Sequence, residues 1–242
     1  MSNEFQTKGV NIAKLPSDYG STGFKMFKGS TLNNVEIAYE TWGELSINKD
    51  NVILLFTGLS PSSHAASSDI NEDKGWWEYM IGPNKPIDTK KYFIVCINSL
   101  GSCFGSTSPA SLNKSTNKVY GLSFPELSIE DIAKAGHDTL LTLGIDHVHT
   151  VIGPSMGGMT ALAYALLYPK SLSNLIVISA AARALPFTIS IRSLQRELIR
   201  SDPLWNQGDY SKQSAPLNGM KLARKLGLMS YRAANELSLI HI

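Results

Sequence analysis

The chain has 242 residues, of which 43% are hydrophobic and 17% charged, and its formal net charge is only +2. This composition is ordinary for a globular protein, and a near-neutral charge without a basic run argues against nucleic acid as a partner. No apolar run is long enough to span a bilayer, and residues 1–8 are polar. We therefore expect a cytoplasmic protein that acts on small molecules, with no nucleic acid and no membrane as partner.

Apolar runs alternate with helix-like segments, which is the pattern of a mostly parallel sheet flanked by helices. Residues 35–42 alternate as a half-buried antiparallel strand does. Residues 52–56 and 92–97 are continuous apolar runs, as expected for strands buried on both faces, and both are placed in the middle of the sheet. The two cysteines, Cys96 and Cys103, form neither a disulfide framework nor a metal site in this interpretation and are expected to be free thiols.

A helix is predicted to begin after Ser128, because Asp131 stands three residues later as the acid of a capping box, and to end at Gly144. Residues 148–152 form the next predicted strand. Residues 174–179 are a further apolar run, and we expect them to form another buried strand. The order of elements is that of an α/β protein.

The stretch 153–158, Gly-Pro-Ser-Met-Gly-Gly, lies between a predicted strand and a helix-like run at 159–167. A sharp strand-to-helix turn of this kind holds a serine in strained geometry above the sheet, and the flanking glycines avoid collisions with the neighbouring strand and helix. The unpaired backbone N–H of Met156 could stabilise an oxyanion. The sequence therefore predicts a nucleophile elbow on Ser155; the alternative is a glycine-rich packing turn.

A serine nucleophile needs a base. Where the serine lies on a strand-to-helix elbow, its catalytic partners follow it along the chain in the order acid, then histidine. Only His241 follows Ser155. The remaining histidines precede the serine, and chain order makes them structural rather than catalytic: His64, His137, His147 and His149. His64 is the one to watch, because it lies in a loop near the expected site.

The character of the chain changes at Arg183, after which helix-like segments at 187–200 and 220–226 are separated by loops. We interpret residues 1–182 as the core and residues 183–236 as a helical cap or lid that would shape acyl and acceptor pockets. The alternative is a peripheral helical pair with no role at the site.

From about Val35 to Glu236 the sequence resembles the homoserine O-acetyltransferase family of α/β-hydrolase fold enzymes. The motifs that carry the resemblance are Gly75-Trp76-Trp77, Ile81-Gly82-Pro83, Pro86-Ile87-Asp88-Thr89, the run 101–107, Phe124-Pro125 and Asp202-Pro203-Leu204-Trp205. The resemblance implies an α/β-hydrolase fold with a helical cap. It also implies acyl transfer from acyl-CoA to an amino-acid hydroxyl through an acyl-serine, in cysteine or methionine biosynthesis, with no further cofactor, no metal and a homodimeric assembly.

The family's site residues fall on Ser155 as nucleophile, on the backbone amides of Leu59 and Met156 as oxyanion hole, and on Arg224 as substrate-binding residue. A guanidinium can hold a carboxylate with two parallel hydrogen bonds, which suits Arg224 to an amino-acid acceptor. The family's triad Asp and His would lie beyond this chain, so they are absent from it, and the fragment is expected to be inactive. Neither Asp202 nor Asp209 is assigned as the acid.

Pro154 and the run 61–64 depart from the commoner family pattern and resemble the branch of serine O-succinyltransferases. An additional arginine, Arg192 or Arg196, would suit the carboxylate of a succinyl group, whereas acetyl offers no charge to pair. The donor (acetyl or succinyl) and the acceptor (serine or homoserine) both stay open at this point.

Residues 237–242 depart abruptly from the family pattern and resemble translated adapter sequence, so we interpret them as a non-native tail that includes His241. The C-terminal part of the core would then be missing. Two other functions remain: a serine esterase or hydrolase of the same fold, and a non-catalytic binding protein on this scaffold. A strained Ser155 argues against the binding protein, which has no need of one.

Overall fold

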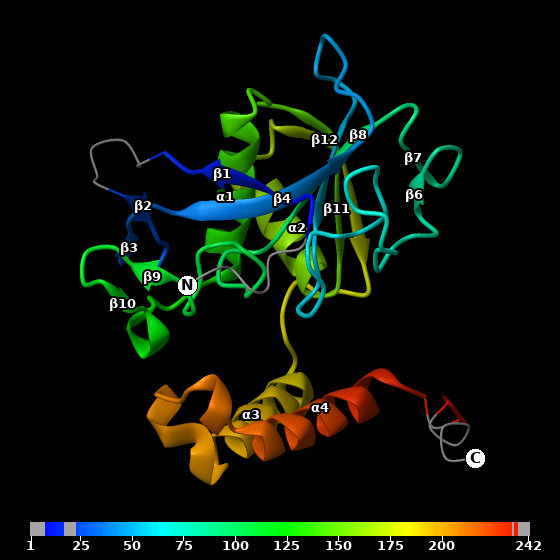
Figure 1. Ribbon diagram of the computed structural model, residues 1–242. Helices are drawn as coiled ribbons and strands as arrows, with labels where there is room; N and C mark the ends of the chain where they lie inside the picture. Colours follow the sequence, from blue (N-terminus) through cyan, green and yellow to red (C-terminus); the bar gives the residue numbers. More distant parts are fainter. Residues whose placement is uncertain (1–7, 17–22, 234, 237–242) are drawn as a thin grey trace. The chain divides into compact units, whose positions relative to one another are not determined.

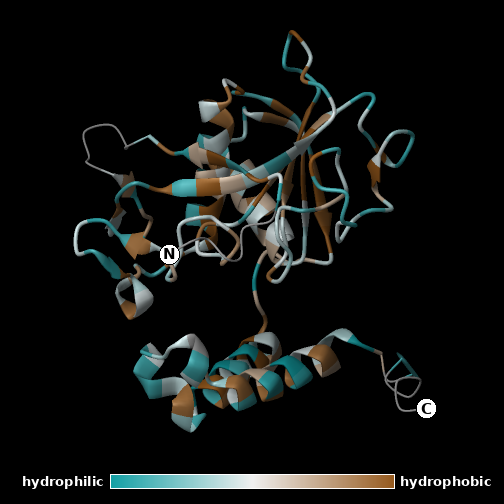
Figure 2. Cartoon of the chain, viewed as in Figure 1, coloured by the Kyte–Doolittle hydropathy of each residue, from teal (hydrophilic) through white to brown (hydrophobic). Residues whose placement is uncertain are grey.

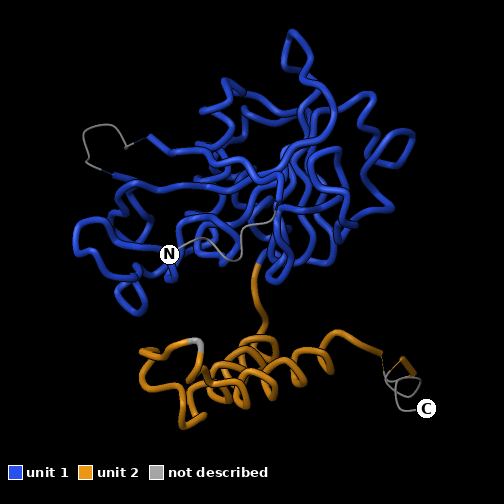
Figure 3. Tube along the Cα trace, viewed as in Figure 1, with its two compact units in different colours: residues 1–182 blue, residues 183–242 orange. Residues whose placement is uncertain are grey.

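The computed structural model describes residues 8–16, 23–233 and 235–236; the expected tail at 237–242 lies outside them. The chain divides into two compact units, residues 1–182 and 183–242 (Figure 3). No helix among the described residues has the length and apolar character that crossing a membrane requires.

Unit 1 is built on a six-stranded sheet with the order β1-β4-β8-β5-β11-β12 (Figure 1). The strands are β1 (Asn11–Lys14), β4 (Glu36–Trp42), β5 (Val52–Phe56), β8 (Phe93–Ile97), β11 (Val148–Pro154) and β12 (Leu172–Ile178). The last four strands in the order are mutually parallel, and β4 is antiparallel to both of its neighbours. The predicted antiparallel strand and the two predicted central strands are confirmed.

The connections carry short two-residue strands that pair into three small ribbons. They are β2 (Phe24–Lys25) with β3 (Thr31–Leu32), β6 (Ile81–Gly82) with β7 (Ile87–Asp88), and β9 (Leu112–Asn113) with β10 (Lys118–Val119), followed by the 3₁₀ turn η1 (Gly121–Ser123).

Two helices pack against one face of the sheet: α1 (Ile129–Thr142) and α2 (Met156–Leu167). The predicted capping box of α1 is present, because the Ser128 side chain accepts from the amide of Asp131 while the Asp131 carboxylate accepts from the amide of Ser128. Gly144 follows the helix with a φ of +68°, which confirms the predicted end.

The core has two parts, one on each face of the sheet. On the helix side, strand residues such as Leu54, Phe56 and Ile97 pack with alanines of α1 and α2 and with the buried Tyr164. On the other face, Leu55 and Cys96 pack with apolar residues of the long segment between β5 and β8, including Trp77. Because β5 and β8 contact both parts, they carry the continuous apolar runs that the sequence shows.

The prediction that residues 174–179 form another buried strand is wrong in its burial. The strand exists as β12, but among residues 8–16, 23–233 and 235–236 it pairs only with β11, at the edge of the described sheet. Its residues 173–176 are exposed, and Leu175 and Ile176 are 38% and 46% exposed. An apolar run shows strand propensity but not the number of neighbouring strands, so sequence could not distinguish an edge from the centre.

Unit 2 contains α3 (Pro186–Arg200), η2 (Pro203–Gly208), η3 (Lys212–Ser214) and α4 (Leu217–Tyr231). Both α-helices carry hydrophilic and hydrophobic stripes (Figure 2). They approach closely where α4 has small residues, since an added Cβ at Gly219 would lie 2.5 Å from the Leu198 carbonyl oxygen. Asp202 secures this unit by accepting from the amides of Leu204 and Gly219, at 3.0 and 2.8 Å.

Candidate active site

Ser155 stands between β11 and α2 with φ 55° and ψ −121°. A positive φ is rare for a residue with a side chain and is sustained only where the surrounding structure enforces it. Here the Ser155 amide donates to the Ile178 carbonyl at the end of β12, at 2.8 Å. The side chain is exposed and makes no capping hydrogen bond to the helix. The predicted strand, turn and helix are therefore present, and the hydroxyl is available.

The glycines around Ser155 are required by backbone contacts rather than by flexibility. A Cβ at Gly153 would lie 2.0 Å from the Gly157 carbonyl oxygen, and one at Gly157 would lie 2.3 Å from the Phe56 carbonyl oxygen. At Gly158 it would lie 2.6 Å from the Ala180 side chain. These distances exclude side chains at all three positions unless the backbone moves, as expected for an elbow wedged between strand and helix.

The backbone amides of Met156 and Leu59 have no hydrogen-bond acceptor among residues 8–16, 23–233 and 235–236. Met156 is the first residue of α2, and Leu59, 67% exposed, lies in the loop directly after β5. Because β5 pairs in parallel with β11, with Leu55 opposite Ile152, both segments leave the sheet at the same edge. Two unpaired N–H groups beside an exposed serine are the ingredients of an oxyanion hole.

His64 does not serve as a base in this structure. Its Nδ1 lies 2.8 Å from Glu40 Oε2 and its Nε2 lies 2.8 Å from the Asp73 carbonyl oxygen, so both ring nitrogens are engaged. Burial lowers the pKa of His64, but the hydrogen bonds and charges of Glu40 and Asp73 outweigh it and raise the pKa overall. A histidine that holds its proton this firmly is a poor proton acceptor for Ser155.

The other three histidines of unit 1 are also occupied elsewhere. His137 stacks on Tyr168 with ring centroids 3.7 Å apart. His147 contacts Ser173 Oγ at 2.8 Å, and His149 packs against Tyr92. His241 lies outside the described residues. Within the described residues, then, Ser155 has no evident base, and no group of three His, Cys, Asp or Glu side chains is placed to hold a metal ion.

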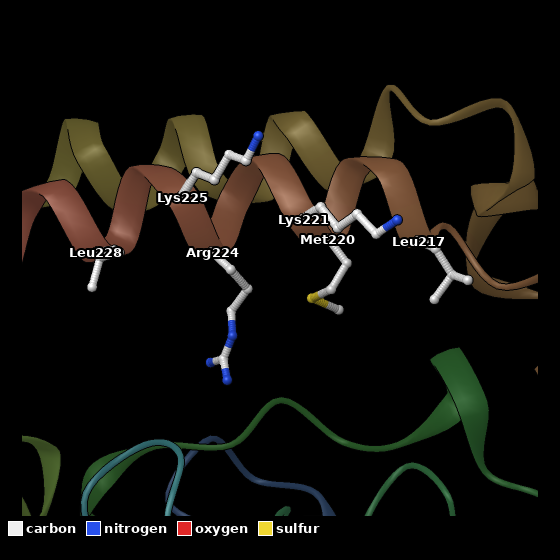
Figure 4. Close-up of a pocket in the computed structure, with 6 residues that line it drawn as sticks. All are labelled: Leu217, Met220, Lys221, Arg224, Lys225 and Leu228. Carbon is white, nitrogen blue, oxygen red and sulfur yellow. The ribbon is translucent and has the colours of Figure 1, made fainter. Parts of the chain in front are cut away.

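Arg224 lies on α4, in a shallow hollow lined by residues of that helix. The lining residues are Leu217, Met220, Lys221, Arg224, Lys225 and Leu228. Figure 4 shows Leu217, Met220, Arg224 and Leu228 pointing to the same side of α4, as their spacing of three and four residues requires. A guanidinium is therefore set among apolar side chains with two lysines nearby, a surface suited to an anionic ligand.

The two arginines of α3 that were predicted to bind the acyl group, Arg192 and Arg196, differ in their surroundings. Arg192 donates to Gln195 Oε1 at 2.6 Å and lies over the Tyr231 ring, 5.4 Å from its centroid. Gln195 in turn donates to the Ala223 carbonyl, so Arg192 belongs to the contact between α3 and α4. Arg196 is exposed. Ser155 belongs to unit 1, whereas Arg192, Arg196 and Arg224 belong to unit 2.

A model of the alpha/beta hydrolase fold family matches residues 51–239. The chain belongs to the α/β-hydrolase fold family. In this family the elbow described above is the site of the nucleophile. The parallel strands β8, β5, β11 and β12 with α1 and α2 at one face are its central sheet, and the predicted fold class is confirmed.

Curated relatives are named serine O-succinyltransferase. That of Litchfieldella anticariensis is 58% identical over 212 residues, covering 88% of this chain and 58% of the relative. That of Xanthomonas oryzae pv. oryzae is 52% identical over 233 residues, covering 96% of this chain and 57% of the relative. The resemblance found in the motifs is thus confirmed, and the chain spans less than three fifths of the length of these relatives.

Solved structures with the same fold include both transferases and hydrolases. A homoserine O-acetyltransferase from Bacillus anthracis is 31% identical with a TM-score of 0.81, covering 92% of this chain and 61% of that one. A mutant esterase is also 31% identical, with a TM-score of 0.87, covering 96% of this chain and 63% of that one. The fold alone therefore does not separate acyl transfer to an amino acid from transfer to water.

The structure also contains site-adjacent groups that sequence reasoning did not identify. Glu40 is a buried carboxylate on β4, in line with the inward-facing Ala38 and Trp42. A charged residue at an inward position of an alternating strand was a signal that could have pointed to it. Ser179, which follows β12, also has a positive φ, 50°. No sequence pattern predicts this backbone conformation.

Proposed function

We propose that this chain carries the nucleophile of an acyl-CoA-dependent O-acyltransferase that transfers a succinyl group to the hydroxyl of L-serine. The observation that carries the proposal is the exposed, strained Ser155 beside two unpaired amides. The names of relatives that are 52–58% identical favour serine and succinyl-CoA over homoserine and acetyl-CoA. Acyl-CoA is a co-substrate in this proposal, and no metal or resident cofactor takes part.

In the proposed reaction, Ser155 Oγ attacks the thioester carbonyl carbon and its proton passes to a base. The amides of Leu59 and Met156 stabilise the oxyanion, and loss of the coenzyme A thiolate leaves an acyl-serine ester. The hydroxyl of L-serine then attacks this ester and regenerates Ser155. Arg224 would hold the acceptor's carboxylate, and Arg192 or Arg196 the succinyl carboxylate.

The acid and the histidine of the triad have no candidates among the described residues, so the proposal assigns both to a part of the protein outside them. Residues 183–236 would form the cap of the site. We further propose that the complete enzyme is a cytoplasmic homodimer, as the family resemblance implies.

A serine esterase is the second candidate, supported by the mutant esterase that shares this fold at a TM-score of 0.87. The two candidates differ only in the acceptor that attacks the acyl-serine. Exclusion of water from the site would favour transfer over hydrolysis.

The test is the fate of the acyl group in protein expressed from the complete reading frame. Succinyl-CoA and L-serine should yield O-succinylserine faster than free succinate, and Ser155→Ala should abolish both products. Arg224→Lys should raise the KM for L-serine, because lysine cannot form the two parallel hydrogen bonds, while Arg200→Lys, an exposed arginine on α3, should have no effect. Free succinate as the main product at saturating L-serine would favour the esterase.

A further inference from the structure

A buried ion pair lies at the end of the loop that carries Leu59. Glu40 and His64 are 3% and 8% exposed, and His64 Nδ1 lies 2.8 Å from Glu40 Oε2. The second carboxylate oxygen accepts from the Ser63 hydroxyl at 3.1 Å. Both oxygens of the carboxylate are therefore used by two consecutive residues of one loop.

The ring of His64 faces a hydrogen-bond acceptor on each side. The Asp73 carbonyl oxygen can only accept a hydrogen bond, so Nε2 carries a proton, and a carboxylate at Glu40 favours a second proton on Nδ1. Asn71 Nδ2 lies farther from Nδ1, at 3.4 Å, and donates to the Lys8 carbonyl at 3.1 Å. The arrangement is that of an imidazolium paired with a carboxylate.

A second strand holds the same loop through Asn98, which follows β8. Asn98 Oδ1 accepts from the Ser63 amide at 2.6 Å, and Asn98 Nδ2 donates to the Ser63 hydroxyl at 3.1 Å and to the Phe104 carbonyl at 2.8 Å. The Trp76 indole donates to the Ser62 carbonyl at 2.9 Å. The loop therefore has a rigid far end, fixed to β4 and β8 by fully hydrogen-bonded polar groups.

The near end of the same loop lies at the elbow. Phe56 and Thr57 present their carbonyl oxygens to Gly157, and a Cβ on Gly58 would lie 3.7 Å from the Pro154 carbonyl oxygen. Leu59 itself is exposed and its amide has no acceptor among the residues described, so nothing local fixes it. Its position depends on the two ends of the loop.

We propose that the Glu40–His64 ion pair is a positioning element for acyl transfer, which fixes the far end of loop 57–64 so that the Leu59 amide stays beside Ser155. The inference rests on the proposed function, because it assigns the ion pair to the oxyanion hole of that reaction. Glu40 and His64 touch no substrate in this view; they act through the loop backbone.

The charged surroundings of the pair favour the imidazolium form. Asp73 adds its negative charge to that of Glu40, and together they overcome the effect of burial on the pKa of His64. Cys96 on β8 is the other titratable group nearby; burial raises the pKa of its thiol well above the usual value and the charge of Glu40 raises it further, so it stays neutral. The surroundings of His64 therefore favour the protonated form of its ring.

The test compares Glu40→Gln with Glu44→Gln in protein from the complete reading frame. Both variants change a carboxylate to its amide, and Glu44 is an exposed residue shortly after the same strand. The first readout needs no turnover: the ¹⁵N shifts of the His64 ring and the relaxation of the Gly58 and Leu59 amides. The second is kcat and KM for succinyl-CoA and L-serine, with thermal unfolding as a check of folding.

We expect Glu40→Gln to lower the pKa of His64, because the hydrogen bond and charge of Glu40 are among the causes that raise it, and to increase motion at Gly58 and Leu59. It should lower kcat by about 10²-fold, near the loss of one oxyanion donor, with KM nearly unchanged and the protein folded. Glu44→Gln should match the unmodified protein.

Unchanged amide relaxation in a folded Glu40→Gln protein overturns the inference. If the unmodified protein has no transferase activity, the proposed function fails, and the relaxation data still decide the role of the ion pair. If Glu40→Gln does not fold, His64→Gln, which removes the other partner of the ion pair, takes its place: motion at Gly58 and Leu59 should increase and kcat should fall, and unchanged relaxation in the folded variant overturns the inference.

Discussion

Gly157→Ala tests whether close packing at the elbow outweighs the higher helix propensity of alanine. Gly157 lies in the first turn of α2, and an added Cβ would stand 2.3 Å from the Phe56 carbonyl oxygen and 2.7 Å from that of Thr57. Both are backbone atoms, one of Phe56 at the end of β5 and one of Thr57 at the start of loop 57–64. Ordinary contact begins at 3.4 Å, so α2 and the end of β5 must separate by about 1.1 Å.

The two possible effects of this substitution have opposite signs. Helix propensity alone favours alanine over glycine by about 1 kcal/mol. Overpacking against the backbone costs about 1–3 kcal/mol, and a displacement of about 1 Å at the site can cost about 10²-fold in rate. We therefore expect a net loss of up to about 2 kcal/mol in the free energy of unfolding and a larger fractional loss of Ser155 reactivity.

Urea unfolding, followed by circular dichroism and by tryptophan fluorescence, measures the change in the free energy of unfolding. Gly227→Ala on α4 is the control, because its Cβ would approach side-chain atoms and not the backbone: Gln195 Nε2 at 2.8 Å and the Tyr231 ring at 3.8 Å. Its cost is limited to displacing the Gln195 amide from the Ala223 carbonyl, so the loss of stability should be smaller than for Gly157→Ala. A Gly157→Ala protein as stable as the unmodified chain, or more stable, would refute the packing argument.

Two further predictions concern the scaffold of unit 1. Asp131 is fully buried and its carboxylate accepts hydrogen bonds from the amides of Phe27 and Ser128, both at 2.8 Å. Asp131→Ala should therefore lower the free energy of unfolding in urea by at least about 2 kcal/mol, with Asp131→Asn in between. Equal stability of all three proteins would contradict the account. The Ser67 amide is the main cause that lowers the pKa of Glu78 from 4.5 to about 2, with help from the Ser67 hydroxyl, the Gly75 amide and Lys85. A depressed pKa stabilises the folded state above the unfolded value, so the stability difference between the unmodified chain and Glu78→Gln should be largest above pH 5 and shrink as pH falls from about 4.5 to 2. A difference that does not change with pH would show that the carboxylate's charge is not involved.

The elbow could be predicted from sequence because its determinants are local. A strand, a serine among glycines and a helix lie within about twenty consecutive residues. Each glycine lies where an added Cβ would collide with nearby backbone, as the motif implies. The capping box at Ser128 and the continuous apolar runs of β5 and β8 are local signals of the same kind.

The remaining features depend on contacts between distant residues. Within the described part of the chain β12 has one neighbouring strand, β11, and the number of neighbours of a strand is set by other segments and not by its own residues. Glu40 and His64 are 24 residues apart and meet only because β4 and the loop after β5 converge. Arg192 could be interpreted from sequence as an acyl-binding residue, but its contact with Tyr231 comes from the packing of α3 on α4.

The most direct test of the central claim is to ask whether Ser155 becomes acylated. Protein from the complete reading frame is mixed with succinyl-CoA without an acceptor, quenched in acid, digested and sequenced by mass spectrometry. We predict a succinyl ester on Ser155 that disappears when L-serine is added, with O-succinylserine released. Formation of O-succinylserine without any ester on Ser155, or an ester on another residue, would contradict the account.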